Sequence, residues 1–188
     1  MDENLLSIKG KVRSCLNKLY TRDAFLFERN NGEGVCERCL AFRFGMYLQC
    51  EFKDYYVDAE YDNTVTYSLD ENNGYVRETN ENKKKQVLDS NGVESNRIPD
   101  IIIHKRSLNL ADDNDYICFE LKKWNRIPKK KLLEKDSSVL ETLTSDYMYL
   151  FGFHIIFGKE KEETKWTIFQ FGDKIKGEKD VLVFENGA

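Results

Sequence analysis

The sequence lacks any long apolar segment, which is the first constraint on what the protein can be. No run of about 18 apolar residues occurs, so the chain is not expected to contain a transmembrane helix. Its first residues, Met1-Asp2-Glu3-Asn4, also lack the basic and then apolar pattern of a secretory signal peptide. These absences argue against a helical membrane protein, and they predict a cytoplasmic location with no membrane partner.

Cysteine and histidine are scarce and are poorly arranged for disulfides or for zinc. The chain has five cysteines and two histidines, and the odd number of cysteines favours reduced thiols over a disulfide framework. Cys36 and Cys39 have the spacing of half a zinc site, but no second pair of ligands exists, and His104 and His154 stand alone. We interpret the cysteine pair as two small side chains on a helix; the alternative is a thiol-based regulator.

An excess of basic charge is absent as well. The 188 residues include 29 basic and 33 acidic side chains, with a formal net charge of −4. This balance argues against broad binding of nucleic acid through bulk charge, although a local basic groove stays compatible with it.

The chain has enough apolar residues for one packed core, since 40% of the residues are hydrophobic and 13% are aromatic. We expect a single domain over residues 1–188, in which residues 63–96 form a variable polar insertion.

Hydrophobic periodicity predicts an α/β chain with a mixed sheet covered by helices. Runs of β-branched and aromatic residues predict strands, and Asp70–Gly74 predicts the turn of a hairpin within the polar insertion. A connection is expected over Thr21–Gly34, with Phe25 and Phe27 as its anchors in the core. The expected elements are helices over residues 1–20, 35–52 and 131–150, and strands over residues 55–61, 64–69, 75–79, 97–103, 117–124, 151–157, 165–171 and 181–184.

The stretch Arg97–Trp124 places acidic residues where buried strands normally carry aliphatic ones. Strand side chains alternate between faces, so one face of the second strand is purely apolar, while Glu120 and Lys122 share the other face. Asp100 begins the neighbouring strand and can therefore lie at the same end of the sheet as Glu120. Two carboxylates offer the oxygen ligands that Mg²⁺ prefers, and a lysine can orient water or offset negative charge. The alternative is a salt-bridged pair of surface strands.

Two further glutamates could join such a site. Glu37 lies three residues before Leu40, on the apolar stripe of the second predicted helix, where a buried carboxylate is costly without a partner. The competing interpretation is an exposed first-turn glutamate favoured by the helix dipole. Glu60 is either an accessory acid or part of a solvated face, and we favour the solvated face. A solvated loop is also our interpretation of the lysines at 83–85.

Pro99-Asp100 followed by Glu120-Leu121-Lys122 resembles the signature of the PD-(D/E)XK, or restriction-endonuclease-like, nuclease superfamily. Within it, the chain resembles a group of uncharacterised prokaryotic restriction-endonuclease-like proteins over Val35–Asp62 and Arg97–Phe157. That likeness rests on Glu37-Arg38, Arg43, Tyr47-Leu48, Tyr56–Tyr61, His104, Asp136, Thr144 and Tyr147. The resemblance implies an αβββαβ core with a mixed central sheet flanked by helices, here with an extra N-terminal helix and C-terminal strands.

The resemblance also implies a function, namely Mg²⁺-dependent hydrolysis of phosphodiester bonds, with Mn²⁺ able to substitute. Asp100 and Glu120 would ligate the metal, Glu37 would ligate a second ion or hold a ligated water, and Lys122 would position the attacking water. The basic strip of Lys123, Arg126 and Lys129 follows this strand and is expected to contact phosphates. DNA is expected as the partner rather than RNA, with a homodimer or a larger defence or repair complex left open. The alternative is a catalytically silent nuclease-fold module that binds nucleic acid or protein.

Overall fold

The computed structural model describes residues 4–32, 34–59, 64–70, 74–80, 86–88, 94–105, 114–124 and 130–175. Its helices are α1 (Leu5–Arg22), α2 (Phe25–Gly32), α3 (Glu37–Glu51), α4 (Lys130–Ser145) and the 3₁₀ turn η3 (Lys161–Glu163). Its strands are β1 (Tyr56–Ala59), β2 (Thr64–Asp70), β3 (Gly74–Asn80), β4 (Gln86–Leu88), β5 (Glu94–Asn96), β6 (Ile101–Lys105), β7 (Asn114–Lys123), β8 (Phe151–Phe157), β9 (Lys165–Gln170) and β10 (Asp173–Lys174).

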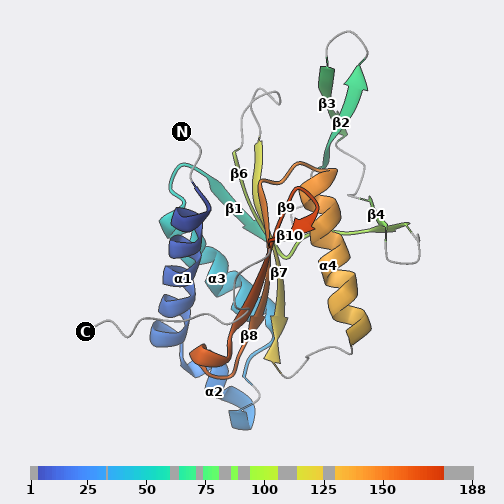
Figure 1. Ribbon diagram of the computed structural model, residues 1–188. Helices are drawn as coiled ribbons and strands as arrows, with labels where there is room; N and C mark the ends of the chain where they lie inside the picture. The colour runs from blue at the N-terminus through green and yellow to red at the C-terminus, as the bar shows by residue number, and fades with distance from the viewer. Residues whose placement is uncertain are drawn as a thin grey trace.

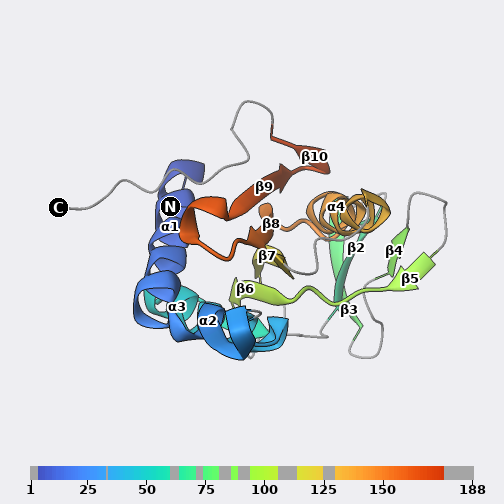
Figure 2. The ribbon, with the colours of Figure 1, turned by 90° about the horizontal axis from the view of Figure 1, so that it is seen from below.

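A mixed sheet forms the centre of the molecule, with the described strands in the order β1-β6-β7-β8-β9-β10 (Figure 1). Neighbouring strands run antiparallel except for β7 and β8, which are parallel and are joined through α4. Figure 2 shows α1, α2 and α3 on one side of this sheet and α4 on the other. The predicted α/β architecture, a mixed sheet flanked by helices, is therefore confirmed.

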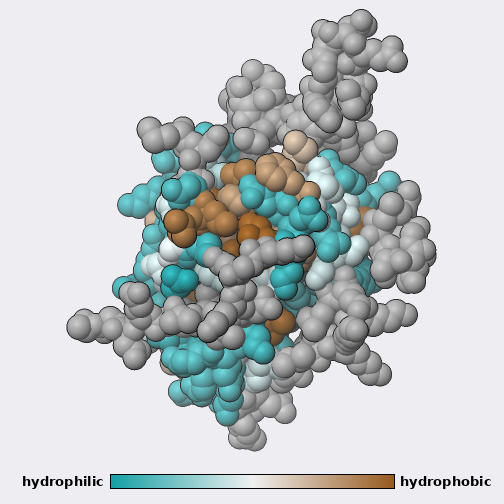
Figure 3. All heavy atoms as spheres, viewed as in Figure 1, coloured by the Kyte–Doolittle hydropathy of each residue, from teal (hydrophilic) through white to brown (hydrophobic). Residues whose placement is uncertain are grey.

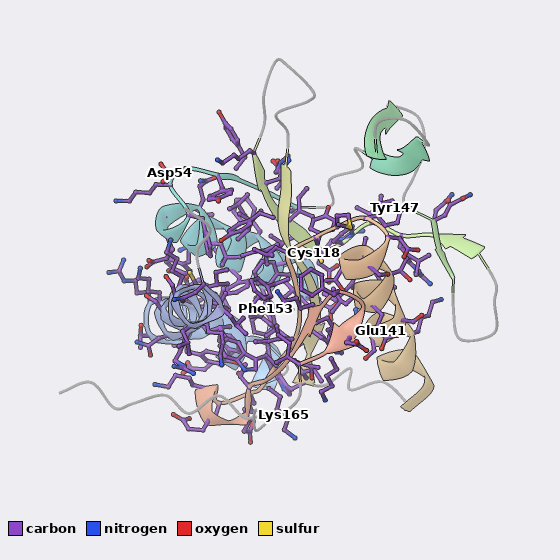
Figure 4. All side chains as sticks on the ribbon, turned by 45° about the horizontal axis from the view of Figure 1, so that its top comes forward. Asp54, Cys118, Glu141, Tyr147, Phe153 and Lys165 are labelled. Atoms are coloured by element: carbon purple, nitrogen blue, oxygen red, sulfur yellow. The ribbon has the colours of Figure 1, made fainter. Side chains whose placement is uncertain are left out.

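The larger core lies between the sheet and α1–α3. In α1, Ile8, Val12 and Leu16 are completely buried at the predicted spacing, and the side chain of Asn4 caps the helix by accepting from Ser7 N at 2.9 Å. The sheet presents Ile117, Phe119 and Leu121 to this layer, and all three are completely buried. Figure 4 shows the density of side chains here, with Phe153 of β8 inside the layer.

The opposite face of the sheet is also buried, because α4 covers it. Ile102, Cys118 and Phe169 of the sheet contact the apolar stripe of α4, which is formed by Val139, Leu140 and Leu143. Gly152 of β8 permits this close approach, since a Cβ atom there would lie 3.2 Å from side-chain atoms of both Leu140 and Thr144. The face of β7 that carries Glu120 and Lys122 is thus enclosed rather than solvated.

Two local predictions are wrong, and a third is confirmed but incomplete. The expected connection after α1 contains the helix α2, in which Phe27 is buried but Phe25 is 50% exposed and is no anchor. The helix expected to reach Leu150 ends at Ser145. The polar insertion contains the predicted hairpin β2–β3, but also a second one, β4–β5, whose Gln86 donates its backbone N–H to the hydroxyl of Tyr147 at 2.7 Å.

Most of the charged residues whose burial the structure describes lie at least partly at the surface. In Figure 3, the described part of one face has hydrophobic atoms gathered near its middle and hydrophilic atoms around them. None of the described helices combines the length and apolarity that crossing a bilayer requires. The predicted strand over 181–184, together with Glu60 and the lysines at 83–85, lies outside the described residues.

Candidate functional site

Asp100 and Glu120 lie beside each other at one end of the β6–β7 pair. Ile101 is opposite Phe119 and Ile102 is opposite Cys118, so continuing the antiparallel register by one residue sets Asp100 beside Glu120. The backbone confirms this placement, because Leu121 N donates to Asp100 Oδ2 at 2.7 Å. Both carboxylates therefore share the face of the sheet that carries Lys122, as the alternation of side chains predicts.

Glu37 reaches the same end of β7 from the first turn of α3. Its Oε2 accepts from Lys123 N at 3.0 Å, and its side chain is half-buried. The competing interpretation, an exposed first-turn glutamate, is therefore wrong about the exposure, although Glu37 does lie in the first turn of α3. Glu37 and Asp100 each accept one backbone amide of β7, two residues apart, so both carboxylates are held by the strand that carries Glu120 and Lys122.

The position of α3 is fixed by a polar clamp at the end of α1. The buried carboxylate of Asp23 accepts from Arg43 Nε at 3.1 Å, from Arg43 Nη2 at 2.8 Å and from the Tyr47 hydroxyl at 2.6 Å. The Arg43 guanidinium holds the pKa of Asp23 below its usual value despite the opposing effect of burial, and Tyr47 lowers it further. These contacts attach α3 to α1 and so determine where Glu37 lies.

A fourth carboxylate and a histidine approach the cluster from the α4 side of the sheet. Asp136 of α4 lies with its Oδ2 3.7 Å from Lys122 Nζ and 3.9 Å from His154 Nε2, which are ion-pair distances too long for good hydrogen bonds. Neither Asp136 Oδ2 nor His154 Nε2 has a hydrogen-bond partner, although both atoms are buried. His154 is adjacent to Glu120 across the parallel β7–β8 pair. Lys122 is thus surrounded by carboxylates.

Burial and the charges of their neighbours shift the pKa values of three of these acids, Glu120, Asp100 and Asp136. Burial raises the pKa of Glu120 well above its usual value, and neighbouring Asp100 raises it further. Burial also raises the pKa of Asp100 and of Asp136, in opposition to the lowering effect of Lys122. For Lys122, burial disfavours the charge, but Asp136, Asp100 and Glu120 outweigh it and raise the pKa. Burial lowers the pKa of His154 to about 4, so this imidazole is neutral at pH 7.

A groove of about 410 Å³ opens beside two of these acids. It is lined by Glu37, Arg38, Ala41, Phe42, Ala59 and Asp100. A second hollow of about 280 Å³ continues from it along α3 and β1, and it shares Ala41, Phe42 and Ala59 with the first. Glu120 is more deeply buried, at 7% exposed. The acidic cluster is therefore reached by solvent from the α3 side, through Glu37 and Asp100.

The basic strip predicted after β7 is described in part. Lys123 is 5% exposed, and its ammonium lies 4.8 Å from the centre of the Trp124 ring, on the side of the sheet that faces α3. Arg126 and Lys129 lie outside the described residues. Contact of these three residues with phosphate stays a prediction.

Sequence reasoning missed three members of the cluster. Asp136 and His154 join it from elements far from the Arg97–Trp124 stretch, and Arg97 exerts a charge effect on both Glu120 and Asp136. The sequence does contain an indication for Asp136. It lies three, four and seven residues before Val139, Leu140 and Leu143, so it shares the buried face of α4 with them. His104, the other histidine, contacts Asp58 at 2.6 Å across β1 and β6.

The donor set fits a hard divalent cation. Four carboxylates, Asp136, Asp100, Glu120 and Glu37, act electrostatically on one lysine, Lys122, and a bound cation would offset their negative charge. Among the described residues, no three His, Cys, Asp or Glu side chains lie close enough to hold an ion by themselves. Mg²⁺ does not require such a cage, because proteins commonly bind it through one or two carboxylates, water and substrate phosphates.

Comparison of the chain with protein-family models, with curated proteins and with solved structures finds no match. The case for a function therefore depends on the geometry of this cluster and on the sequence resemblance.

Proposed function

We propose that this protein is a metal-dependent nuclease of the PD-(D/E)XK superfamily that hydrolyses phosphodiester bonds of nucleic acid, with DNA as the expected substrate. The observation that carries the proposal is the convergence of Asp100, Glu120 and Lys122 on one face of the β6–β7 pair, with Glu37 bonded to the backbone of the same strand. A chance acid-x-Lys tripeptide on a surface strand would not be enclosed by a helix on one side and reached by a third carboxylate from the other.

The chain order supports the proposed fold family. The elements α3, β1, β6, β7, α4 and β8 follow one another as αβββαβ, and the hairpins β2–β3 and β4–β5 are inserted between β1 and β6. The additional helices α1 and α2 precede this core, and β9 and β10 follow it. The insertion leaves the β6–β7 pairing intact, so it adds to the core without interrupting the candidate site.

Asp100 and Glu120 would hold Mg²⁺, and Glu37 would hold a second ion or a water bound to the first. Bound Mg²⁺ would activate water and offset the charge of the phosphate, and Mn²⁺ should replace it because all the donors are oxygens. Lys122 is a cation at neutral pH, so it would donate hydrogen bonds to the attacking water or to a phosphate oxygen. Asp136, at 3.7 Å from Lys122, would keep that ammonium on the site face of β7.

The test is a cleavage assay with DNA and RNA in the presence of Mg²⁺, of Mn²⁺ or of a chelator. Asp100→Ala and Lys122→Ala should each lower metal-dependent cleavage by about 100-fold or more, the usual effect of removing a group that stabilises transition-state charge. Matched controls are Glu162→Gln and Lys53→Ala, which change exposed side chains remote from the cluster and should cleave like the wild type. Equal cleavage by wild type, Asp100→Ala and Lys122→Ala would reject this active site.

Metal titration separates a nuclease from a silent module with the same fold. Calorimetry with Mn²⁺ should detect binding that Asp100→Asn weakens by about tenfold or more, while Glu162→Gln leaves it unchanged. A protein that binds DNA equally well with and without metal, and whose affinity Asp100→Asn does not alter, would instead be a binding module.

A further inference from the structure

Two thiols lie at the start of α3, one on each side of Glu37 and Arg38. Cys36 is the N-cap residue, with an extended backbone at φ −65° and ψ 154°, and Cys39 belongs to the first turn. Both side chains are exposed, and their Sγ atoms are 3.0 Å apart. The interpretation of this pair as two small side chains on a helix is wrong for Cys36, which lies outside the helix as its N-cap residue, while Cys39 lies within the helix as expected.

The geometry of the pair is compatible with formation of a disulfide between Cys36 and Cys39. A disulfide has an S–S length of about 2.05 Å and connects Cα atoms about 4.4–6.8 Å apart, a separation that residues three apart in a helical turn satisfy. The two sulfurs therefore need to approach by only about 1 Å, which a change of side-chain rotamer can supply. The extended conformation of Cys36 assists, because it turns this side chain back over the first turn of α3.

The surroundings favour thiol chemistry over metal binding. Cys36 is the N-cap residue of α3, and the positive end of the helix dipole at that position favours a thiolate. Among the described residues, no further His, Cys, Asp or Glu completes a metal-binding group with the two thiols. Cys15 and Cys118 are buried, and Cys50 is exposed at the far end of α3, so only the pair combines exposure with contact between two thiols.

We propose that Cys36 and Cys39 form a dithiol–disulfide exchange site whose substrates are low-molecular-weight disulfides. The thiolate of Cys36 attacks one sulfur of the substrate disulfide and releases its other half as a thiolate, which takes up a proton. Cys39 then loses its proton and attacks Sγ of Cys36, which releases the second half as a thiol. Overall the protein dithiol loses two electrons and two protons, and the small disulfide becomes two thiols.

This site is separate from the proposed nuclease activity and does not depend on it. It is nevertheless adjacent to the acidic cluster, because Glu37 follows Cys36 directly and accepts the amide of Lys123. The thiol pair and Glu37 therefore lie in the same helical turn. The experiment below measures only the oxidation and modification of the cysteines. A negative result in the nuclease assay therefore does not count against this proposal.

The experiment uses the full chain carrying Cys50→Ser, which removes the third exposed thiol. The protein is equilibrated with mixtures of reduced and oxidised glutathione, quenched with acid, alkylated and analysed by peptide mass spectrometry. The expected result is a single two-electron transition that loses both thiols, yields a Cys36–Cys39 disulfide and retains no glutathione, while Cys15 and Cys118 stay unmodified in the folded protein.

The matched control is the Cys50→Ser chain that also carries Cys39→Ser. It lacks the resolving thiol, so the glutathione adduct on Cys36 should accumulate there and be absent from the chain that keeps both thiols. Two results would overturn the proposal: stable glutathione adducts on both cysteines of the Cys50→Ser chain, or a pair that remains fully alkylated in every glutathione mixture. Circular dichroism of each variant confirms that the compared proteins are folded.

Discussion

Substituting alanine for Gly34 should destabilise the protein strongly, because this residue joins α2 to α3 where the chain approaches the end of β7. Gly34 has φ +69°, in the left-handed region that favours glycine. A Cβ atom there would lie 2.6 Å from Trp124 Cη2 and 2.8 Å from the carbonyl oxygen of Leu26. The indole could shift, but the Leu26 carbonyl is held in the turn, where it accepts from Val35 N at 2.8 Å.

Two effects lower the stability of the Gly34→Ala variant, namely backbone strain and steric overpacking. An L-residue in the left-handed region costs about 1–2 kcal/mol, and forcing extra atoms into a packed site costs about 1–3 kcal/mol. The free energy of unfolding should therefore fall by about 2–5 kcal/mol. In a domain of this size, each kcal/mol lowers the melting temperature by roughly 2–4 °C, so a decrease of roughly 4–20 °C is expected.

The assay is urea unfolding followed by circular dichroism, with Gly10→Ala as the matched control. Gly10 lies in the exposed middle of α1, and a Cβ atom there would meet nothing within 4 Å. This substitution should stabilise the protein by about 0.5–1 kcal/mol, because alanine restricts the unfolded chain and favours helix. If Gly34→Ala cost less than about 0.5 kcal/mol while Gly10→Ala behaved as expected, the close approach of Gly34 to the Leu26 carbonyl would be refuted.

Two further predictions concern charge. Asp23→Asn should lower the free energy of unfolding by about 1.5–3 kcal/mol at pH 7, the usual value of hydrogen bonds to a charged group. Because the folded pKa of Asp23 lies below its unfolded value, that stabilisation is present above about pH 4 and is lost as the pH falls through the folded pKa. The difference from wild type should thus shrink in acid, and a pH-independent difference in urea titrations would contradict the clamp. Glu120→Gln should stabilise the metal-free protein by about 1–2 kcal/mol at pH 7, since the folded pKa of Glu120 is raised, and the gain should vanish near about pH 4. Urea titrations with a chelator at both pH values measure this, and a loss of stability at pH 7 would show that the carboxylate is a structural group.

The local elements followed from the order of residues with few exceptions. The stripe of Ile8, Val12 and Leu16 predicted α1, and the alternation along Ile117–Lys122 predicted which face of β7 lies in the larger core. These patterns are short-range, so the chain reveals them without knowledge of its partners. The helix α2 was missed because Asn30, Asn31 and Gly32 indicate turns, whereas burial of Leu26 and Phe27 against the rest of the core favours a helix there.

The candidate site was predictable only in outline. Pro99-Asp100 and Glu120-Leu121-Lys122 indicated two strands with acids at one end, and the register of β6 and β7 brings those acids together. Asp136 and His154 were not assigned to the site, because their contacts with Lys122 and Glu120 depend on how α4 crosses the sheet and on the parallel pairing of β8. The contact between Cys36 and Cys39 likewise depends on α3 beginning at Glu37 rather than at Val35.

The sequence by itself determined the secondary structure of most of the chain, the buried face of each main element and the acids and lysine of the β6–β7 pair. Periodicity carries this information, because a helix or strand exposes its faces at fixed intervals. Only the tertiary structure decided that the polar face of β7 is enclosed by α4, that Glu37 reaches the backbone of Lys123, and that Asp136 lies beside Lys122. Those facts arise from contacts between residues far apart in the chain, whose geometry is set by packing of whole elements against one another.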